Sequence, residues 1–287
     1  TNEATGIVVP IDPSVFATEI ERLALETMRV SLLRELSDTE RALELVVDLD
    51  LRRDGSDRKL QLLATGDGGL TVSIFGAGIG NPLDLSRFTG SLRGRVSSDD
   101  MGSISEFFGA DMSGTSDLLF WTDASAGQAS TVFEVTGDAL FPASDVLLPS
   151  IAFSVNGTAT LESDQSWVNI AQAAVTLEQG PVQFNDINVG LTTTGWELLV
   201  NDLDLASSAE LLLEAGLIPD SAREPLVAAS ISGTINALSL SGSLSDESIQ
   251  RVAVDFDDIF VQEDTPFPGI SGLSGSLRLS GHAGQLQ

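Results

Sequence analysis

The chain has no cysteine and no tyrosine, and its 287 residues include a single histidine, His282, and a single lysine, Lys59. Without cysteine it forms no disulfide and offers no thiolate as a nucleophile or metal ligand. One histidine is too few for a zinc site of the usual histidine and cysteine type. A serine–histidine catalytic pair would depend on His282 in a glycine-rich segment at the end of the sequence, which is a poor setting for it. These absences indicate a protein that is not an enzyme.

Positive charge is also scarce, because 14 Lys and Arg residues stand against 42 Asp and Glu residues, giving a net charge of −28. Nucleic-acid binding depends on Lys and Arg replacing the counterions of phosphates, so we expect no nucleic-acid partner. Such a chain is also repelled by anionic lipid headgroups wherever it lacks a basic patch. The charge is equally typical of proteins that stay soluble in salty surroundings, so it identifies no partner by itself.

No motif for a cofactor or a metal emerges from the glycines and carboxylates. Carboxylate pairs such as Asp257 and Asp258 are so numerous that pairing carries no specificity for acid–base catalysis, and solvated carboxylates explain them better. The aspartates around Gly55 miss the spacing of a calcium loop. The run Gly76-Ala-Gly78-Ile-Gly80 lacks the following helix that a phosphate-binding loop requires. We therefore expect no cofactor.

Long hydrophobic runs are missing too, since none approaches the ~18 residues of a membrane-spanning helix. Apolar residues instead alternate with polar ones, most regularly between 151 and 162, where Ile151, Phe153 and Val155 share one parity. Alternation of this kind is typical of a strand with one apolar and one polar face. It recurs along most of the chain from about residue 43 onward, which predicts a mainly β protein.

Several strands change parity midway, for example where Ile235 is followed by Leu238 and Leu240. One face stays apolar across such a switch only if a bulge or corner is inserted. The pair Asn156-Gly157 is a candidate for another bulge. We therefore expect a long, twisted and strongly curved antiparallel sheet.

Two helical insertions are predicted, near 13–42 and at 207–228. Asp12 and Pro13 supply an N-cap and a first-turn proline, and the segment to Leu36 contains neither Gly nor Pro. Ser37 to Glu40 match a capping box, which predicts a further turn there. The second insertion has Ser207 or Ser208 as its cap. The expected organisation is a helical insertion at 1–42, strands at 43–206, a helical insertion at 207–228 and further strands at 229–287.

A sheet with one apolar face has more than one way to keep that face from water. It can form an elongated groove, as a half-open barrel whose apolar walls hold acyl chains. Alternatively, it can close against a second layer in a β-sandwich or solenoid, as a structural or adhesive module does. Periodicity alone leaves both architectures open.

The C-terminal third carries a more specific pattern between Asn201 and Leu286. A strand is followed by a two-part helical segment, then by Ser232-Gly-Thr-Ile235 and, after another strand, by Pro268-Gly-Ile-Ser-Gly-Leu-Ser-Gly-Ser-Leu277. The order and spacing of these motifs resemble the YhdP branch of the AsmA-like proteins. The resemblance covers about 85 residues, and each short motif alone is weak.

This resemblance implies a section of a protein that is anchored in the inner membrane and extends through the periplasm. Members are thought to conduct phospholipids toward the outer membrane along a β groove, so phospholipid acyl chains are the expected partner. The strong acidity departs from a typical member. The residues expected to line the groove, each with ordinary core packing as the alternative, are Phe153, Val155, Phe184, Val189, Leu191, Leu198, Val200, Leu238, Leu240, Val254 and Phe256.

Overall fold

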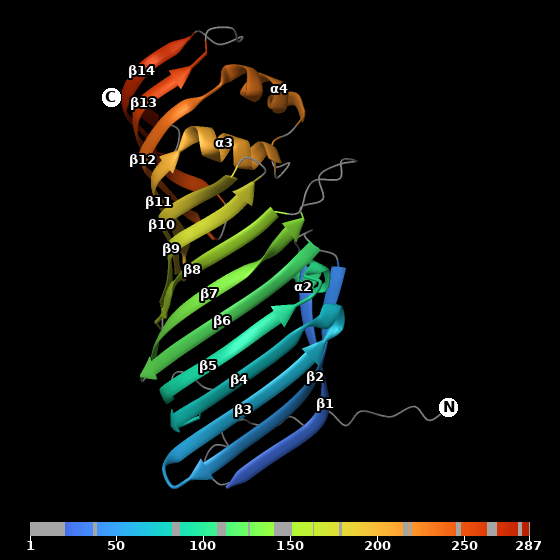
Figure 1. Cartoon of the computed structure of the whole chain (residues 1–287). Helices are drawn as coiled ribbons and strands as arrows, with labels where there is room; N and C mark the ends of the chain where they lie inside the picture. The colour runs from blue at the N-terminus through green and yellow to red at the C-terminus, as the bar shows by residue number, and fades with distance from the viewer. Residues whose placement is uncertain are drawn as a thin grey trace.

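A computed structural model describes residues 21–36, 39–81, 87–107, 113–125, 127–140, 151–162, 164–177, 180–214, 218, 220–244, 248–262, 269–280 and 283–286. These residues form one antiparallel sheet of 15 strands whose spatial order is the order of the sequence (Figure 1). The protein is therefore mainly β, as its alternating sequence predicts.

The strands are β1 (Arg22–Leu36), β2 (Thr39–Asp54), β3 (Asp57–Gly66), β4 (Thr71–Ile79), β5 (Thr89–Ser98), β6 (Ser113–Ser125), β7 (Gln128–Leu140), β8 (Ile151–Leu161), β9 (Gln165–Leu177), β10 (Gly180–Thr192), β11 (Gly195–Asp204), β12 (Ser232–Ser243), β13 (Ile249–Val261), β14 (Ile270–Ser280) and β15 (Ala283–Leu286). The helices are the 3-10 turn η1 (Asp67–Gly69), α2 (Gly102–Phe107), α3 (Leu205–Glu214) and α4 (Asp220–Ala229).

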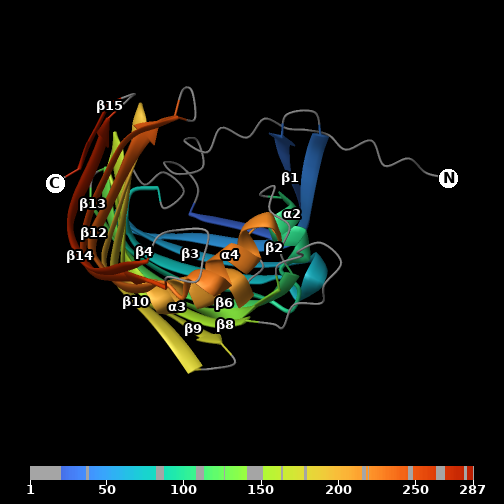
Figure 2. The ribbon, with the colours of Figure 1, turned by 90° about the horizontal axis from the view of Figure 1, so that it is seen from above.

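The sheet curves along its length and is not closed. Figure 2 shows the strands following an arc, with α3 and α4 on the inner side of that arc. Within the described ranges, β1 pairs with β2 alone and β15 with β14 alone, so the two ends of the sheet do not meet. Neighbouring strands lie about 4.8 Å apart, so 15 strands in line extend over about 67 Å.

The predicted N-terminal helix is wrong where the structure describes it. Residues 22–36 and 39–54 form β1 and β2, which pair as a hairpin, so the predicted helix is absent from these residues. Of the predicted capping box, Thr39 and Glu40 belong to β2, and Ser37 and Asp38 lie outside the described residues. The reason is a bulge between Leu25 and Met28, where Thr27 has a φ of 57°. A bulge shifts the parity of a strand, which spreads apolar residues into spacings that resemble a helix. The predicted cap at Asp12 and Pro13 lies outside the described residues.

The second insertion is confirmed, because α3 and α4 occupy 205–214 and 220–229. Its cap differs from the prediction: the Ser207 backbone N–H donates to the Asp204 Oδ1 at 2.8 Å. Asp204 directly precedes the first helical residue, so it is the N-cap. At the other end of α3, Arg223 Nη2 donates to the Leu213 carbonyl at 2.9 Å, which ties α4 to α3.

The predicted bulges are confirmed as well. The register shifts at Asn156 and Gly157 between β8 and β9, and between Ile235 and Ala237 where β12 pairs with β13. Further shifts occur between Asn185 and Asn188 in β10 and within β13. Because bulges bend a strand and increase its twist, their number agrees with the curvature of the sheet.

Candidate functional site

Cross-strand register divides the side chains of the sheet into two faces. One row runs through directly opposed residues from Val168 to Val189, Leu198, Leu240 and Val252. The adjacent residues in the same strands point to the other face, as successive side chains in a strand do. Leu211 of α3 packs against Ile151, Leu177 and Val182 of the first set. Since α3 lies inside the arc, we call this set the inner face and the opposite set the outer face (Figure 2).

All eleven residues that the sequence analysis selected lie on this inner face. Five pairs show this directly, because the opposed residues are Phe153 and Val175, Val155 and Ala173, Phe184 and Ala173, Val200 and Leu238, and Val254 and Leu277. The remaining members belong to the same rows: Val189, Leu191, Leu198, Leu240 and Phe256. The register therefore brings these eleven apolar residues, the first and last of which are more than one hundred positions apart, onto one face of the sheet.

The burial of these residues distinguishes a single layer from a closed core. Nine of the eleven are half-buried, Val200 is buried and Leu191 is exposed. The extensive contacts of each described strand are with its sequence neighbours, so no second sheet of described residues covers the inner face. A β-sandwich would place two sheets face to face and bury both inner surfaces. The described strands do not form such a sandwich.

The inner face also extends further toward the N-terminus than the sequence-selected residues. Leu51, Leu60 and Leu92 of β2, β3 and β5 belong to it, and Leu51 and Leu60 are both 6% exposed. Large apolar side chains on the outer face are more exposed to water: Trp121 is 51% exposed and Val132 is 53% exposed. The alternation that begins near residue 43 indicated strands in this part of the chain, but it did not place these leucines beside the eleven selected residues.

Charge is nearly absent from the inner face. Among the inner-face residues of β2 to β14 that pair with a residue on a neighbouring strand, the charged ones are Arg53 and Arg58. These two lie opposite each other at the end of β2 and the start of β3. Burial lowers the pKa of Arg58, and the nearby positive charge of Arg53 lowers it further. The rows between the edges are therefore uncharged.

A hollow of about 380 Å³ opens on the inner face across β4 to β9. Its walls come from apolar side chains, among them Ile74, Leu92, Phe120 and Val168, with Thr122 and Thr131 bonded to each other through their hydroxyls at 2.8 Å. Because the two threonine hydroxyls form a hydrogen bond with each other, they leave few free hydrogen-bonding groups facing the hollow. This arrangement suits an apolar guest.

One side chain, Phe88, and one helix, α3, cover the margins of the inner face. Phe88 is fully buried and packs against Leu92, Ala124 and Ala129 beside the β4–β5 connection. At the opposite margin, α3 covers the β8–β10 region through Leu211. The centre of the face between these margins has no covering element among the described residues.

Other kinds of site find little support in the described part of the chain. It contains no group of three or more His, Asp or Glu side chains arranged to hold a metal ion. None of its helices combines the length and apolarity needed to cross a membrane. Comparison with protein-family models, with curated proteins and with solved structures found no match to this chain.

Proposed function

We propose that this chain is a section of a bridge-like periplasmic protein that conducts phospholipids between the inner and outer membranes. In this proposal the inner face is an elongated groove that holds acyl chains, while headgroups stay in water at its open side. The protein performs no catalysis, and its parent chain is anchored in the inner membrane. The membrane anchor, the periplasmic location and the lipid cargo rest on the resemblance to the YhdP branch of the AsmA-like proteins.

The observation that supports the proposal best is the continuity of the uncharged inner face. An acyl chain loses about 0.8 kcal/mol of favourable transfer free energy for each methylene exposed to water. A lipid leaving a bilayer avoids that cost only if the next surface is apolar without interruption. The row from Val168 through Leu198 to Val252 crosses five strands, β9 to β13, without a charged or polar side chain.

Sliding also requires that the face be open and unspecific. The half-buried state of most inner-face residues leaves apolar surface available to a guest. Aliphatic side chains hold acyl chains by dispersion and exclusion of water, which have no directional preference. A lipid is therefore retained without being fixed at one position.

Photocrosslinking tests the proposal at residue resolution. A photoreactive amino acid is placed at 155 or 254 on the inner face, and at the adjacent positions 156 or 253 on the outer face, in the full-length parent chain expressed in cells. We expect phospholipid adducts, identified by mass spectrometry, at 155 and 254 and none at 156 and 253. Equal labelling of the two faces, or no phospholipid in native mass spectra of the gently purified protein, would refute the groove.

A further inference from the structure

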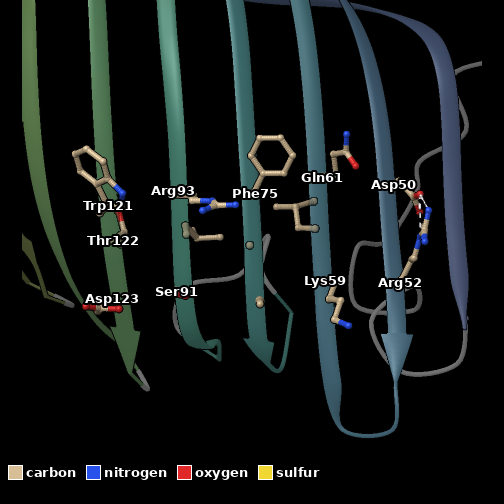
Figure 3. Close-up of a pocket in the computed structure, with 14 residues that line it drawn as sticks. Asp50, Arg52, Lys59, Gln61, Phe75, Ser91, Arg93, Trp121, Thr122 and Asp123 are labelled. Atoms are coloured by element: carbon tan, nitrogen blue, oxygen red, sulfur yellow. Dashed lines mark hydrogen bonds and ion pairs between the residues drawn. The ribbon is translucent and has the colours of Figure 1, made fainter.

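The outer face carries a second feature, which is a shallow dish of about 610 Å³ across β2 to β6. Its volume falls in the range of about 300–1,000 Å³ that small-ligand sites occupy. Its lining side chains come from neighbouring strands, β2 to β6 (Figure 3). We call it the outer dish. Its lining includes the cations Arg52, Lys59 and Arg93, the carboxylates Asp50 and Asp123, and the side chains of Gln61, Phe75, Ala77, Ser91 and Trp121.

Two aromatic side chains flank a cation in the outer dish. Arg93 lies directly opposite Phe75 on one side and Trp121 on the other. Its guanidinium carbon lies 5.7 Å from the centre of the Phe75 ring, a cation–π distance. Figure 3 shows the Arg93 side chain directed toward Phe75. This contact orients the guanidinium while leaving its N–H donors available.

Among the described residues, Arg93 has no carboxylate partner, in contrast to four other arginines of the outer face. No residue that the structure describes forms an ion pair with it. Four other arginines do have such a partner: Arg22 and Arg52 contact Asp50, Arg95 contacts Asp117 and Arg278 contacts Asp255. In a chain with 42 acidic residues, an oriented arginine without a carboxylate is available to an anionic group from outside.

The floor and the opposite wall of the dish fit a ligand with both polar and apolar surface. Ala77 lies between Lys59 and Ser91 in register, and its short side chain leaves room above the sheet. Lys59 supplies a second cation on the wall facing Arg93, although Asp54 approaches its Nζ at 3.9 Å. Trp121, half of it exposed, offers a flat apolar surface beside Arg93.

We infer that the outer dish binds an oligosaccharide that carries carboxylated sugars. The apolar C–H face of a sugar ring stacks on an indole, and its hydroxyls suit the Gln61 and Ser91 side chains. A carboxylate matches the fork of N–H donors of a guanidinium, which favours an acidic sugar over a neutral one. The overall charge of −28 repels anions, and Asp50 and Asp123 line the dish itself, so retention of such a ligand depends on the guanidinium of Arg93, which has no carboxylate partner among the described residues.

Binding is measured by isothermal titration calorimetry with a hexasaccharide of alternating glucuronic acid and N-acetylglucosamine. The neutral hexamer of N-acetylglucosamine serves as the ligand control. We expect the acidic probe to bind at least 10-fold more tightly than the neutral one. Trp121→Ala and Arg93→Gln each weaken binding of the acidic probe at least 10-fold. Trp167→Ala is the matched control, because Trp167 is an outer-face tryptophan outside the dish, and its affinity stays within 2-fold.

Three outcomes overturn the inference. The first is the absence of any binding by the wild-type protein, whose fold is checked by circular dichroism. The second is equal loss of binding in the Trp121→Ala and Trp167→Ala variants, which would mean unspecific contact. The third is binding to vesicles that contain phosphatidylglycerol in place of the hexasaccharide, with the same dependence on Arg93, which would assign the dish to a membrane surface. None of these outcomes depends on lipid in the inner face.

Discussion

Val155 and Asn156 are consecutive in β8 and point to opposite faces of the sheet, where Val155 lies opposite Ala173 and Asn156 lies opposite Gln172. The same relation holds along most of the sheet, so a change at one residue and a change at its neighbour test different surfaces. Substitutions at two adjacent residues therefore provide the best matched test of one face against the other.

The first prediction uses this pair directly. Val155→Asp places a carboxylate in the uncharged rows of the inner face, where an acyl chain cannot solvate it. We expect at least a tenfold loss of copurifying phospholipid in native mass spectra. Asn156→Asp adds the same charge to the outer face and leaves the lipid content unchanged. Retention of lipid by the Val155→Asp protein would mean that the inner face is not its binding surface.

A second prediction concerns the margin of the inner face at Phe88. This side chain is fully buried against Leu92, Ala124 and Ala129, so Phe88→Ala removes a large packed group and leaves a cavity. We expect the free energy of unfolding to fall by about 3–5 kcal/mol, as measured in urea. Phe75→Ala removes the same ring from the outer face, where it is 39% exposed, and costs less than about 1 kcal/mol. Similar losses in the two variants would contradict the packing of Phe88.

The third prediction follows from the cap of α3. Asp204 accepts the Ser207 backbone N–H, so Asp204→Ala leaves that donor without its partner and costs about 0.5–2 kcal/mol. Hydrogen exchange at the Ser207 amide should accelerate in this variant and stay slow in Asp204→Asn. Ser207→Ala should leave the exchange unchanged, because the serine side chain does not provide the cap. If Ser207→Ala has the larger effect, the helix begins later than the structure shows.

A fourth prediction concerns pH. Hydrogen bonds from Arg52 and Arg22 lower the pKa of Asp50 from 3.8 to about 2. Because the folded pKa is lowered, the stabilising contribution of this ion pair is complete above pH 3.8 and disappears as the pH falls through about 2. We expect the Asp50 carboxyl carbon to titrate with a midpoint near 2 in NMR spectra. Arg52→Gln should raise that midpoint toward 3.8, whereas Arg278→Gln, distant along the sheet, should not change it.

Features that depend on residues close in the sequence were predicted correctly, and features that depend on strand pairing between distant residues were not. Alternation of apolar residues is local, and it correctly predicted strands from about residue 43 onward, within which the register places the eleven selected residues on one face. The insertion at α3 and α4 was likewise correct, because the signals for a helix start lie within one turn of the chain. In the N-terminal segment, the bulge at Thr27 broke the alternation and imitated a helix. Pairing with β2 then outweighed the intrinsic helix propensity of that segment.

The outer dish was not predicted at all. Lys59, Phe75, Arg93 and Trp121 are far apart in the sequence, and only the register of the four strands β3 to β6 brings them together. Each of them alone is an ordinary outer-face residue in an alternating strand. No local pattern identifies such a site, because its geometry depends on how every intervening turn sets the register.

The sequence by itself determined that the chain is mainly β and which neighbouring side chains point to opposite faces of a strand, since a period of two assigns each side chain relative to its neighbours. It also determined the absence of thiolate chemistry and the excess of negative charge. The tertiary structure alone decided that the apolar face lies inside the arc, that the described strands form one layer, and that Arg93 stands between two aromatic rings. These features arise from strand pairing and from the bending at bulges, which are long-range properties that local alternation does not encode.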